Sequence, residues 1–483
     1  MRLPLTPVLS PSEAALVSQA ALPHELLRAF GSPLNLVFPQ EVRRNYERFT
    51  AQLAALEVDG GLLYAQKANK SLALLRELAF AGCGMNNASL AEVQRALANG
   101  CPAELVEAGG PKSAAYIALA CQAGTIVNVD SFAELQQVQA LSQRLGICTR
   151  ILLRMSGFRT AGVQILSKPT RFGIDVDTSH ETLRFLCDHR SQLDFVGLSY
   201  HLDTVAISEK VVALDGLIGL SLDAMRMGLP VRWLDIGGGF KVNYLQHQDQ
   251  WEAYMTALRE ALLGRSPAVT WQGTGFGLRA EDGVIRGNLN MYSYYDFPVQ
   301  EHYLKELLAQ TSNEAGMTFE QFFKETRIRL VLEPGRALLA GAGMTLARVE
   351  ELRRGPAGEL LIRLDMNRAD ITIQDLELFV DPLIIPSPAA GEAREPQPMH
   401  EGCYLIGNLC LESDFISRRK VFLAQQPQVG DLLAFANSAG YIMDFNAHRA
   451  ALQPIAEKIA VFMDAAGRLQ WVHDEAYWPT LSL

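Results

Sequence analysis

From about residue 40 onward, short apolar segments alternate with longer amphipathic ones, and this alternation limits the possible folds more than any other feature. Short apolar runs predict buried strands and the longer segments predict helices, so the region should form a parallel sheet. Eight strand–helix units are the number that closes a (β/α)8 barrel. The candidate strands are 61–65, 82–87, 103–107, 125–129, 150–154, 194–199, 231–236 and 328–333.

Two of the expected helices begin with a recognisable cap. Ser89 is followed by Glu92, and Ser131 by Glu134, each pair with the spacing of a capping box. In that motif the serine and the glutamate satisfy each other's free backbone amides. We therefore expect helices to start directly after Ser89 and Ser131.

After about residue 337 the alternation stops. Segments 344–349, 359–365, 402–407 and 431–436 have the pattern of strands without long helices between them. We expect a second, mostly antiparallel β domain over residues 337–483.

Residues 241–332 lie between Phe240 and Glu333, and this stretch is much longer than one crossover needs. The part near 265–325 is therefore an insertion, and it contains Tyr292, Tyr294 and Tyr295. Long excursions in compact domains are often functional lids or disordered segments. A passive surface loop is an equally open interpretation.

Composition excludes several classes of protein. The net charge is −10 and no basic cluster is evident, so nucleic acid is not an expected partner. No apolar run is long enough to span a bilayer, and the N-terminus lacks the pattern of a secretory signal. Seven scattered cysteines without a Cys-x-x-Cys pair predict reduced thiols in the cytoplasm, with no disulfide framework and no metal site.

Polar and glycine residues gather where the expected strands end. In a (β/α)8 barrel the carboxyl ends of all strands meet at one face, and active sites lie there. Residues without a function have no reason to share that face, so the pattern predicts an active site. The residues are Lys67, Asn86, Asp130, Arg154, His201, Gly237 and Glu333.

Two of these positions point to particular chemistry. Lys67 can form a Schiff base with a carbonyl if burial or a nearby cation lowers its pKa, although a solvated loop lysine is the alternative. Gly237, Gly238 and Gly239 lack Cβ atoms, so their amides can surround an anion such as phosphate, although a plain turn has the same sequence.

Glu333 and Arg336 place a carboxylate and a guanidinium close together after the last barrel strand. The carboxylate could bind a protonated ring nitrogen and the guanidinium a phosphate, whereas a surface ion pair is the plainer interpretation. His201 alone could be a core histidine, and Cys410 alone a buried apolar thiol. A lysine for an aldehyde, amides and an arginine for phosphate, and a carboxylate for a ring nitrogen together describe pyridoxal 5'-phosphate, or PLP.

The same motifs, in the same order, resemble the fold-type III pyridoxal-phosphate decarboxylases, the ornithine and diaminopimelate decarboxylase group. The resemblance covers roughly residues 40–450. The motifs are Tyr64-Ala65-Gln66-Lys67-Ala68-Asn69, His201 with Thr204, Gly237 to Gly239, Glu333 to Arg336, the Cys410 segment and Gly440-Tyr441.

This resemblance implies an architecture and a set of roles. Residues 39–336 would form the PLP-binding barrel, and residues 1–38 would pack with the C-terminal β domain, as in the alanine racemase and decarboxylase fold. The protein would be a homodimer with active sites shared between subunits. Lys67 would carry PLP, His201 would stack on its ring, Glu333 would bind its nitrogen, and Cys410 would enter from the partner chain to protonate the product. The phosphate would be bound by Thr204, Gly237, Gly238, Gly239, Gly335, Arg336 and Tyr441.

Departures from the family pattern affect the substrate side. Leu411 replaces the acidic residue that family members place directly after the cysteine, and Glu412 follows one position later. Asp203 replaces a usual glycine, and Asn86 replaces an aspartate near the lysine. We therefore expect a substrate other than ornithine or diaminopimelate. Arg154, Glu412 and Asp414 are the candidate substrate residues, and a branch serving siderophore or other specialised-metabolite synthesis fits the same departures.

Two other functions remain open from the sequence. A PLP-dependent racemase on the same fold needs a base on each face of the substrate carbon, and a partner-chain tyrosine in place of Cys410 would favour it. A non-catalytic, decarboxylase-like regulator is the second alternative. Retention of Lys67, Glu333 and Cys410 together argues against loss of catalysis.

Overall fold

The computed structural model describes residues 2–159, 170–292, 294–372, 376–388 and 397–482. Eight parallel strands form a sheet in the order β5-β4-β3-β2-β14-β9-β8-β6, and pairing of β5 with β6 closes it. The predicted (β/α)8 barrel is confirmed. Its strands are β2 (Gly60–Ala65), β3 (Gly84–Asn87), β4 (Val106–Ala108), β5 (Ile126–Val129), β6 (Thr149–Ser156), β8 (Leu193–Ser199), β9 (Trp233–Asp235) and β14 (Arg329–Leu332).

One predicted strand begins later than its apolar pattern suggested. Residues 103–105 form a 3-10 turn, and β4 starts only at Val106. The turn follows Pro102, which has no backbone N–H to donate to a sheet ladder. The prediction of a strand at 103–107 is therefore wrong for residues 103–105 and correct for residues 106 and 107.

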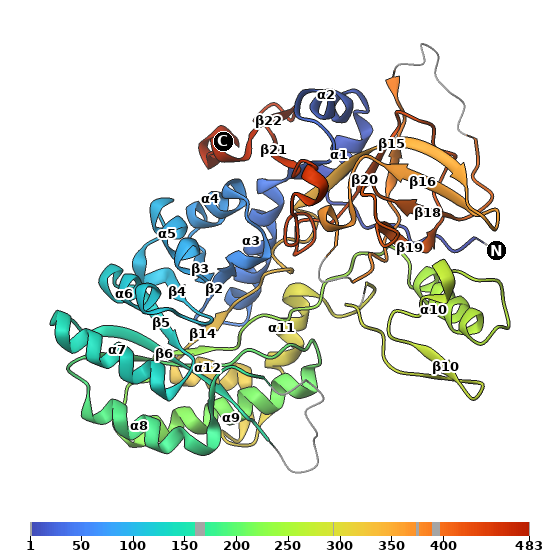
Figure 1. The fold of residues 1–483 in the computed structure, drawn as a ribbon. Helices are drawn as coiled ribbons and strands as arrows, with labels where there is room; N and C mark the ends of the chain where they lie inside the picture. The colour runs from blue at the N-terminus through green and yellow to red at the C-terminus, as the bar shows by residue number, and fades with distance from the viewer. Residues whose placement is uncertain (1, 160–169, 293, 373–375, 389–396, 483) are drawn as a thin grey trace.

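Helices surround the barrel (Figure 1). Ser89 and Ser131 cap their helices through the backbone N–H groups of Glu92 and Glu134, as expected. The glutamate half of the box differs, because the Glu92 carboxylate accepts from the N–H of Ala88, one residue before the cap. The helices are α3 (Pro39–Ala55), α4 (Leu72–Phe80), α5 (Leu90–Ala98), α6 (Ala114–Ala123), α7 (Phe132–Leu145), α8 (Ser179–Asp188) and α9 (Ile207–Arg226).

A second sheet, mostly antiparallel, forms the other domain, as predicted. Strand β1 (Leu34–Val37) lies between β15 and β21, so the N-terminal segment is part of this sheet. The helices α1 (Pro11–Ser18) and α2 (Ala21–Phe30) pack on it. The other strands are β15 (Gly343–Arg354), β16 (Leu360–Leu364), β17 (Leu383–Ile385), β18 (Cys403–Ile406), β19 (Phe415–Val421), β20 (Leu432–Phe435), β21 (Glu457–Met463) and β22 (Leu469–His473).

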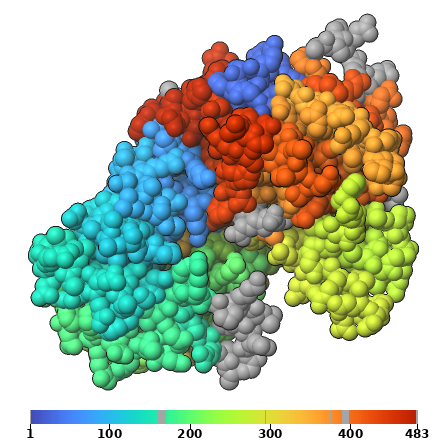
Figure 2. Space-filling model, in the orientation of Figure 1, coloured from blue at the N-terminus to red at the C-terminus, as the bar shows by residue number. Residues whose placement is uncertain are grey.

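The long insertion docks on the second domain. Helix α10 (Gln248–Leu262) and the hairpin of β10 (Arg279–Glu281) and β11 (Val284–Arg286) project beside the barrel, below β19 (Figures 1 and 2). Thr270 forms a β-bridge with Arg419, and Trp271 packs on Tyr404 and Phe415 at 5.2 and 4.8 Å between ring centres. The chain then returns to β14 through α11 (Gln300–Leu308), β12 (Thr311–Ser312), β13 (Met317–Thr318) and α12 (Phe319–Thr326).

No helix in the described part of the chain is long and apolar enough to cross a membrane. All seven cysteines lie in that part, and each is a free thiol.

Candidate active site

Lys67 lies in a short 3-10 turn, Gln66–Ala68, directly after β2. Its side chain is exposed within the single chain, whereas both neighbours are buried. Gln66 donates to Asn87 Oδ1 at 2.7 Å, and the Ala68 carbonyl accepts from the N–H of Tyr441 at 2.9 Å. The flanking residues are therefore fixed while the Lys67 amine stays accessible.

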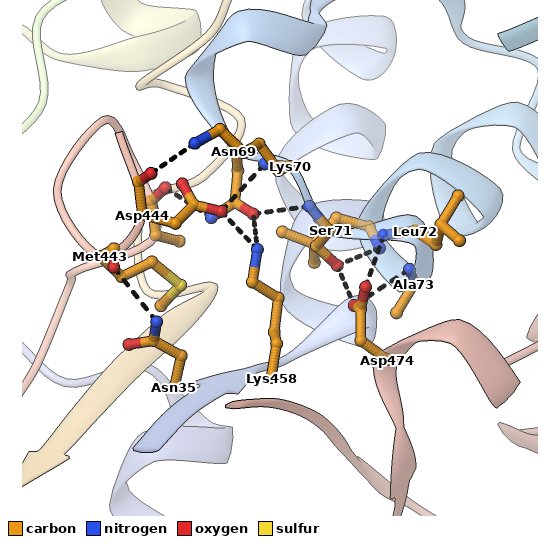
Figure 3. A network of polar contacts seen from close by, with 12 residues as sticks. Asn35, Asn69, Lys70, Ser71, Leu72, Ala73, Met443, Asp444, Lys458 and Asp474 are labelled. Atoms are coloured by element: carbon orange, nitrogen blue, oxygen red, sulfur yellow. Dashed lines mark hydrogen bonds and ion pairs between the residues drawn. The ribbon is translucent and has the colours of Figure 1, made fainter. Parts of the chain in front are cut away.

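The second domain anchors the segment that follows Lys67 (Figure 3). Lys70 donates to the Asp444 carbonyl at 2.7 Å, and Lys458 binds both Asn69 and the Asp444 carboxylate. Asp474 accepts hydrogen bonds from the first turn of α4. The position of Lys67 at the barrel mouth therefore depends on both domains.

Glu333 follows β14 and is buried, with only 8% of its surface exposed. The Asn86 amide donates to Glu333 Oε1 at 2.6 Å, and His201 Nδ1 lies 3.7 Å from Oε2. Burial raises the pKa of Glu333, but the neighbouring His201, Lys67 and Arg154 lower it by more, so the pKa lies below its ordinary value. Glu333 is therefore an ionised carboxylate inside the barrel mouth.

His201 is neutral in this arrangement. Burial lowers the pKa of its imidazole, against the opposing effect of Glu333. The N–H of Gly238 donates to His201 Nδ1 at 3.3 Å, which requires that nitrogen to be unprotonated. Lys67 and Arg154 are therefore the charged groups near Glu333, and they lower its pKa in addition to the hydrogen-bonding effect of His201.

Two further buried acids lie beside Glu333, and neither was a candidate site residue in the sequence. Oxygens of Glu107, Asp235 and Glu333 all lie within 4.8 Å of one another. Asn86 and Asn128 donate to Glu107 Oε1 at 3.0 and 2.8 Å. Burial, with the charge of Glu333, raises the pKa of Glu107 to about 8 and that of Asp235 well above its ordinary value. Glu107 is therefore mostly protonated at neutral pH, and the raised pKa of Asp235 favours its protonated form as well.

The three glycines do not offer three free amides. The N–H of Gly237 donates to Asp235 Oδ1 at 2.8 Å, and that of Gly238 to His201. In the described residues no hydrogen bond engages the N–H of Gly239. A phosphate at this run would therefore meet the Gly239 amide first.

Arg336 presents an unused donor near the barrel mouth. Its guanidinium lies 4.0 Å from the ring centre of Tyr292 and 5.5 Å from that of Tyr441, and Nη1 donates to the Tyr244 hydroxyl at 3.4 Å. Nη2 is buried without a hydrogen-bond partner in the described structure. A buried donor of this kind is costly unless an acceptor binds it. Together with the free Gly239 amide, it fits the phosphate of PLP.

Two other expected phosphate residues have structural contacts. Thr204 Oγ1 accepts from the N–H of Ala206 at 3.0 Å, which orders the turn before α9. A Cβ at Gly335 would lie 2.7 Å from the Tyr441 hydroxyl, so this position requires glycine to let Tyr441 approach.

Two tyrosines of the insertion, Tyr292 and Tyr294, lie near Arg336 in different surroundings. Tyr292 lies on Arg336 and is 40% exposed. Tyr294 is buried, packs on Phe379 and donates to the Glu377 carbonyl at 3.2 Å, which is a structural role. Tyr292 and Tyr294 both line a small cavity with Arg336, and of these two Tyr292 is the exposed one.

The expected substrate residues differ in their surroundings. Arg154 lies near the C-terminal end of β6, 3.8 Å from Asp130 Oδ1, and stacks on the Phe172 ring at 4.8 Å. Asp414 is buried, and its carboxylate accepts from the N–H groups of Leu409 and Arg368, both at 2.8 Å. These contacts favour a structural role for Asp414 in ordering the loop before it.

The loop that contains Cys410 is exposed in the single chain. Cys410, Leu411 and Glu412 all face solvent, and Leu411 has 61% of its surface exposed. The replaced glycine position, Asp203, is also exposed. Single exposed apolar side chains are ordinary on protein surfaces, so the exposure of Leu411 shows only that this loop is accessible in the single chain.

The family model for the pyridoxal-binding domain of pyridoxal-dependent decarboxylases matches residues 39–284. The chain belongs to this family. The match covers the barrel from α3 to β9, including Lys67, His201 and the glycine run, and ends before β14. The enzyme is therefore a PLP-dependent decarboxylase, and PLP is its cofactor.

Relatives and solved structures agree with this assignment. The protein y4yA of Sinorhizobium fredii is 28% identical, over 97% of this chain and 96% of its own. Diaminopimelate decarboxylase of Pseudomonas aeruginosa is 25% identical, over 90% of this chain and 89% of its own. In fold, the chain is similar to diaminopimelate decarboxylase of M. jannaschii in complex with L-lysine, with a TM-score of 0.69, 18% identity and 99% of both chains covered.

Proposed function

We propose that this decarboxylase removes the α-carboxylate of an amino acid that is neither ornithine nor diaminopimelate. The observation that carries the proposal is the contrast between two parts of the site. Lys67, His201 and Glu333 lie together at the barrel mouth, whereas the exposed loop has Leu411 where the family has an acid. The cofactor chemistry is retained and the surface for the distal end of the substrate is changed.

The residues at the barrel mouth would have different roles toward the cofactor. PLP supplies the electron sink for the negative charge left when the carboxylate departs. Lys67 provides the amine that attaches the cofactor. Glu333, ionised and fixed by Asn86, can hold a proton on the pyridine nitrogen, because an opposite charge nearby favours the charged form. His201 offers a neutral ring on which the cofactor ring can stack.

We propose that the proton returned to the product comes from Cys410 of a second copy of the chain. Cys410 and Leu411 are exposed in the single chain, and burial of such a loop in a two-fold interface would place it at the partner's barrel mouth. The homodimer with shared active sites is part of this proposal. The free thiols in turn support a cytoplasmic location.

The identity of Leu411 limits which substrates the site can bind. A leucine cannot accept a hydrogen bond from a distal ammonium, and an unpaired buried ammonium is costly. Arg154, Glu412 and Tyr292 remain as the polar or aromatic groups for a different distal end. Arg154 suits an anionic distal group and Tyr292 an uncharged one, whereas Glu412 is the one acid of this set that could pair with the ammonium of a diamino acid.

A substrate panel tests the proposal directly. The purified protein is incubated with amino acids of differing distal groups, and carbon dioxide and products are measured by mass spectrometry. We expect release from at least one substrate that is not a diamino acid. Racemised substrate without carbon dioxide would indicate the racemase instead, and no conversion of any substrate would support the regulator.

Attachment of the cofactor is tested separately. Borohydride should fix pyridoxal phosphate to Lys67, and Lys67→Ala should lose the label. Label on Lys70 or Lys112 would show that the assignment of Lys67 is wrong. Lys70 and Lys112 both make hydrogen bonds to backbone carbonyls, so they are suitable internal comparisons.

A further inference from the structure

A lysine that belongs to none of the sequence motifs is fully buried beside the glycine run. Lys210 lies in the first turn of α9, with no exposed surface. Its ammonium donates to the Gly238 carbonyl at 2.6 Å and lies 5.7 Å from the ring centre of Phe240. Lysine is almost never fully buried without a partner, because its charge must leave water. The burial of Lys210 against the glycine run therefore suggests that this lysine has a function there.

The contact with Lys210 sets the direction of one peptide group. The peptide between Gly238 and Gly239 is trans, so its carbonyl and the N–H of Gly239 point in opposite directions. With the carbonyl held by Lys210, this N–H points away from the ammonium. It is also the amide of the run that no hydrogen bond engages within the described residues. The lysine therefore presents the one free amide of the glycine run.

Close packing leaves little freedom in this arrangement. A Cβ at Gly239 would lie 2.6 Å from the Thr204 carbonyl and 3.2 Å from Lys210 Nζ, and the backbone has a φ of 79°. Only glycine fits without a shift of its neighbours. The loop and the ammonium therefore form one fixed unit.

The ammonium also brings charge to the site. Burial lowers the pKa of Lys210 to about 8, against the opposing effect of Glu333 and Asp235, so the lysine is mostly protonated at neutral pH. A cation bound to the carbonyl polarises the peptide and strengthens its N–H as a donor. An anion on the N–H side gains further from the positive charge at low dielectric.

We propose that Lys210 is a positioning residue for the cofactor phosphate, holding and polarising the Gly238–Gly239 peptide so that the Gly239 N–H donates to a phosphate oxygen. The inference rests on the proposed function, because it requires PLP in this site with its phosphate at the free Gly239 amide. The simpler alternative is that Lys210 only balances the charge of Glu333, the ionised acid of the buried cluster. That role would affect folding or all ligands alike, whereas the proposed role acts on the phosphate alone.

Comparing two ligands separates these roles. Apoprotein is titrated with pyridoxal phosphate and with pyridoxal, which lacks the phosphate, and attachment is followed by absorbance. For Lys210→Met we expect binding of pyridoxal phosphate to weaken by about tenfold or more, the effect of one charge-assisted hydrogen bond. Binding of pyridoxal should stay within about twofold of wild type, as expected if no phosphate contact is involved. Lys241→Met, which removes a half-buried lysine paired with Asp296, is the matched control and should change neither.

The other possible binding results would each contradict the proposed role of Lys210. Equal weakening for both ligands would assign Lys210 a structural role, and unchanged binding of both would leave it no role in the site. Lys210→Gln keeps an N–H donor without the charge, so it should lose less affinity for pyridoxal phosphate, and it decides the matter if Lys210→Met does not fold. If wild-type protein attaches neither ligand, the proposed function itself is wrong.

Discussion

Replacement of Asp474 should loosen the segment that carries Lys67. Asp474 lies in the second domain and is buried. Its carboxylate accepts from the N–H of Leu72 at 2.7 Å and of Ala73 at 3.2 Å, and it also binds the Ser71 hydroxyl (Figure 3). These groups form the N-terminus of α4, where helices leave backbone donors unpaired and favour negative charge.

The magnitude follows from the contacts that are lost. Hydrogen bonds to charged groups contribute about 1.5–3 kcal/mol each, and a carboxylate at a helix N-terminus adds about 0.3–1 kcal/mol. Ser71 still caps the N–H of Leu74, so part of the helix start survives. We expect Asp474→Ala to lower the free energy of unfolding by about 3–5 kcal/mol. Asp474→Asn, which keeps an acceptor, should cost about 1–2 kcal/mol.

Urea unfolding followed by circular dichroism, at one protein concentration, measures this effect. Glu475→Ala is the control, because it removes the same charge from the exposed neighbouring residue and should change stability by less than about 0.5 kcal/mol. Asp474→Ala should also bind pyridoxal phosphate more weakly than Glu475→Ala, since the turn with Lys67 directly precedes α4. An unfolding midpoint for Asp474→Ala equal to that of wild type would refute the argument.

Four further predictions concern the site. Glu333→Gln should keep PLP but lower kcat by about 10²–10⁴-fold, and a near-wild-type rate would remove Glu333 from the mechanism. The pKa of Glu107 is raised to about 8 from 4.5, so wild-type stability should fall as pH rises through this range. Glu107→Gln cannot ionise, so its melting temperature should fall less between about pH 6 and 8.5, and an equal fall would contradict protonation of Glu107. Co-expressed Lys67→Ala and Cys410→Ala chains should regain activity, because a mixed dimer has one site with both groups intact. No activity in verified mixed dimers would place Cys410 outside the partner's site. Leu411→Glu should raise turnover of ornithine and lysine, and efficient turnover of either by wild type would contradict the substrate proposal.

The barrel could be predicted because its signals are local. Strands buried on both faces form continuous apolar runs, and turns that carry glycine or proline separate them from the helices. The C-terminal ends of such strands converge by geometry, which is why the sequence alone predicts Lys67, His201 and Glu333 at one face. The β4 boundary was misplaced because residues 103–105 are apolar or helix-compatible and their 3-10 turn has no distinct pattern.

Residues whose role depends on a partner distant in sequence were not predictable in the same way. Lys210 occupies a helix position where a lysine ordinarily faces solvent, and only the fold brings it to the Gly238 carbonyl. Glu107 is a lone acid in a short apolar strand, which was the one available signal that it is buried near other polar groups. Tyr294 and Tyr292 are two positions apart, yet one is core and the other lies on Arg336.

The replacement of a family aspartate by Asn86 is explained by the buried acids around it. Oxygens of Glu107, Asp235 and Glu333 already lie within 4.8 Å of one another, and a fourth carboxylate at position 86 would add repulsion at low dielectric. An amide can instead donate to Glu107 and Glu333 together, at 3.0 and 2.6 Å. Protons then stay on Glu107 and Asp235, while the charge stays on Glu333, the acid nearest the cationic residues. Asn86 therefore helps to keep Glu333 as a single ionised carboxylate at the barrel mouth, while Glu107 beside it stays protonated.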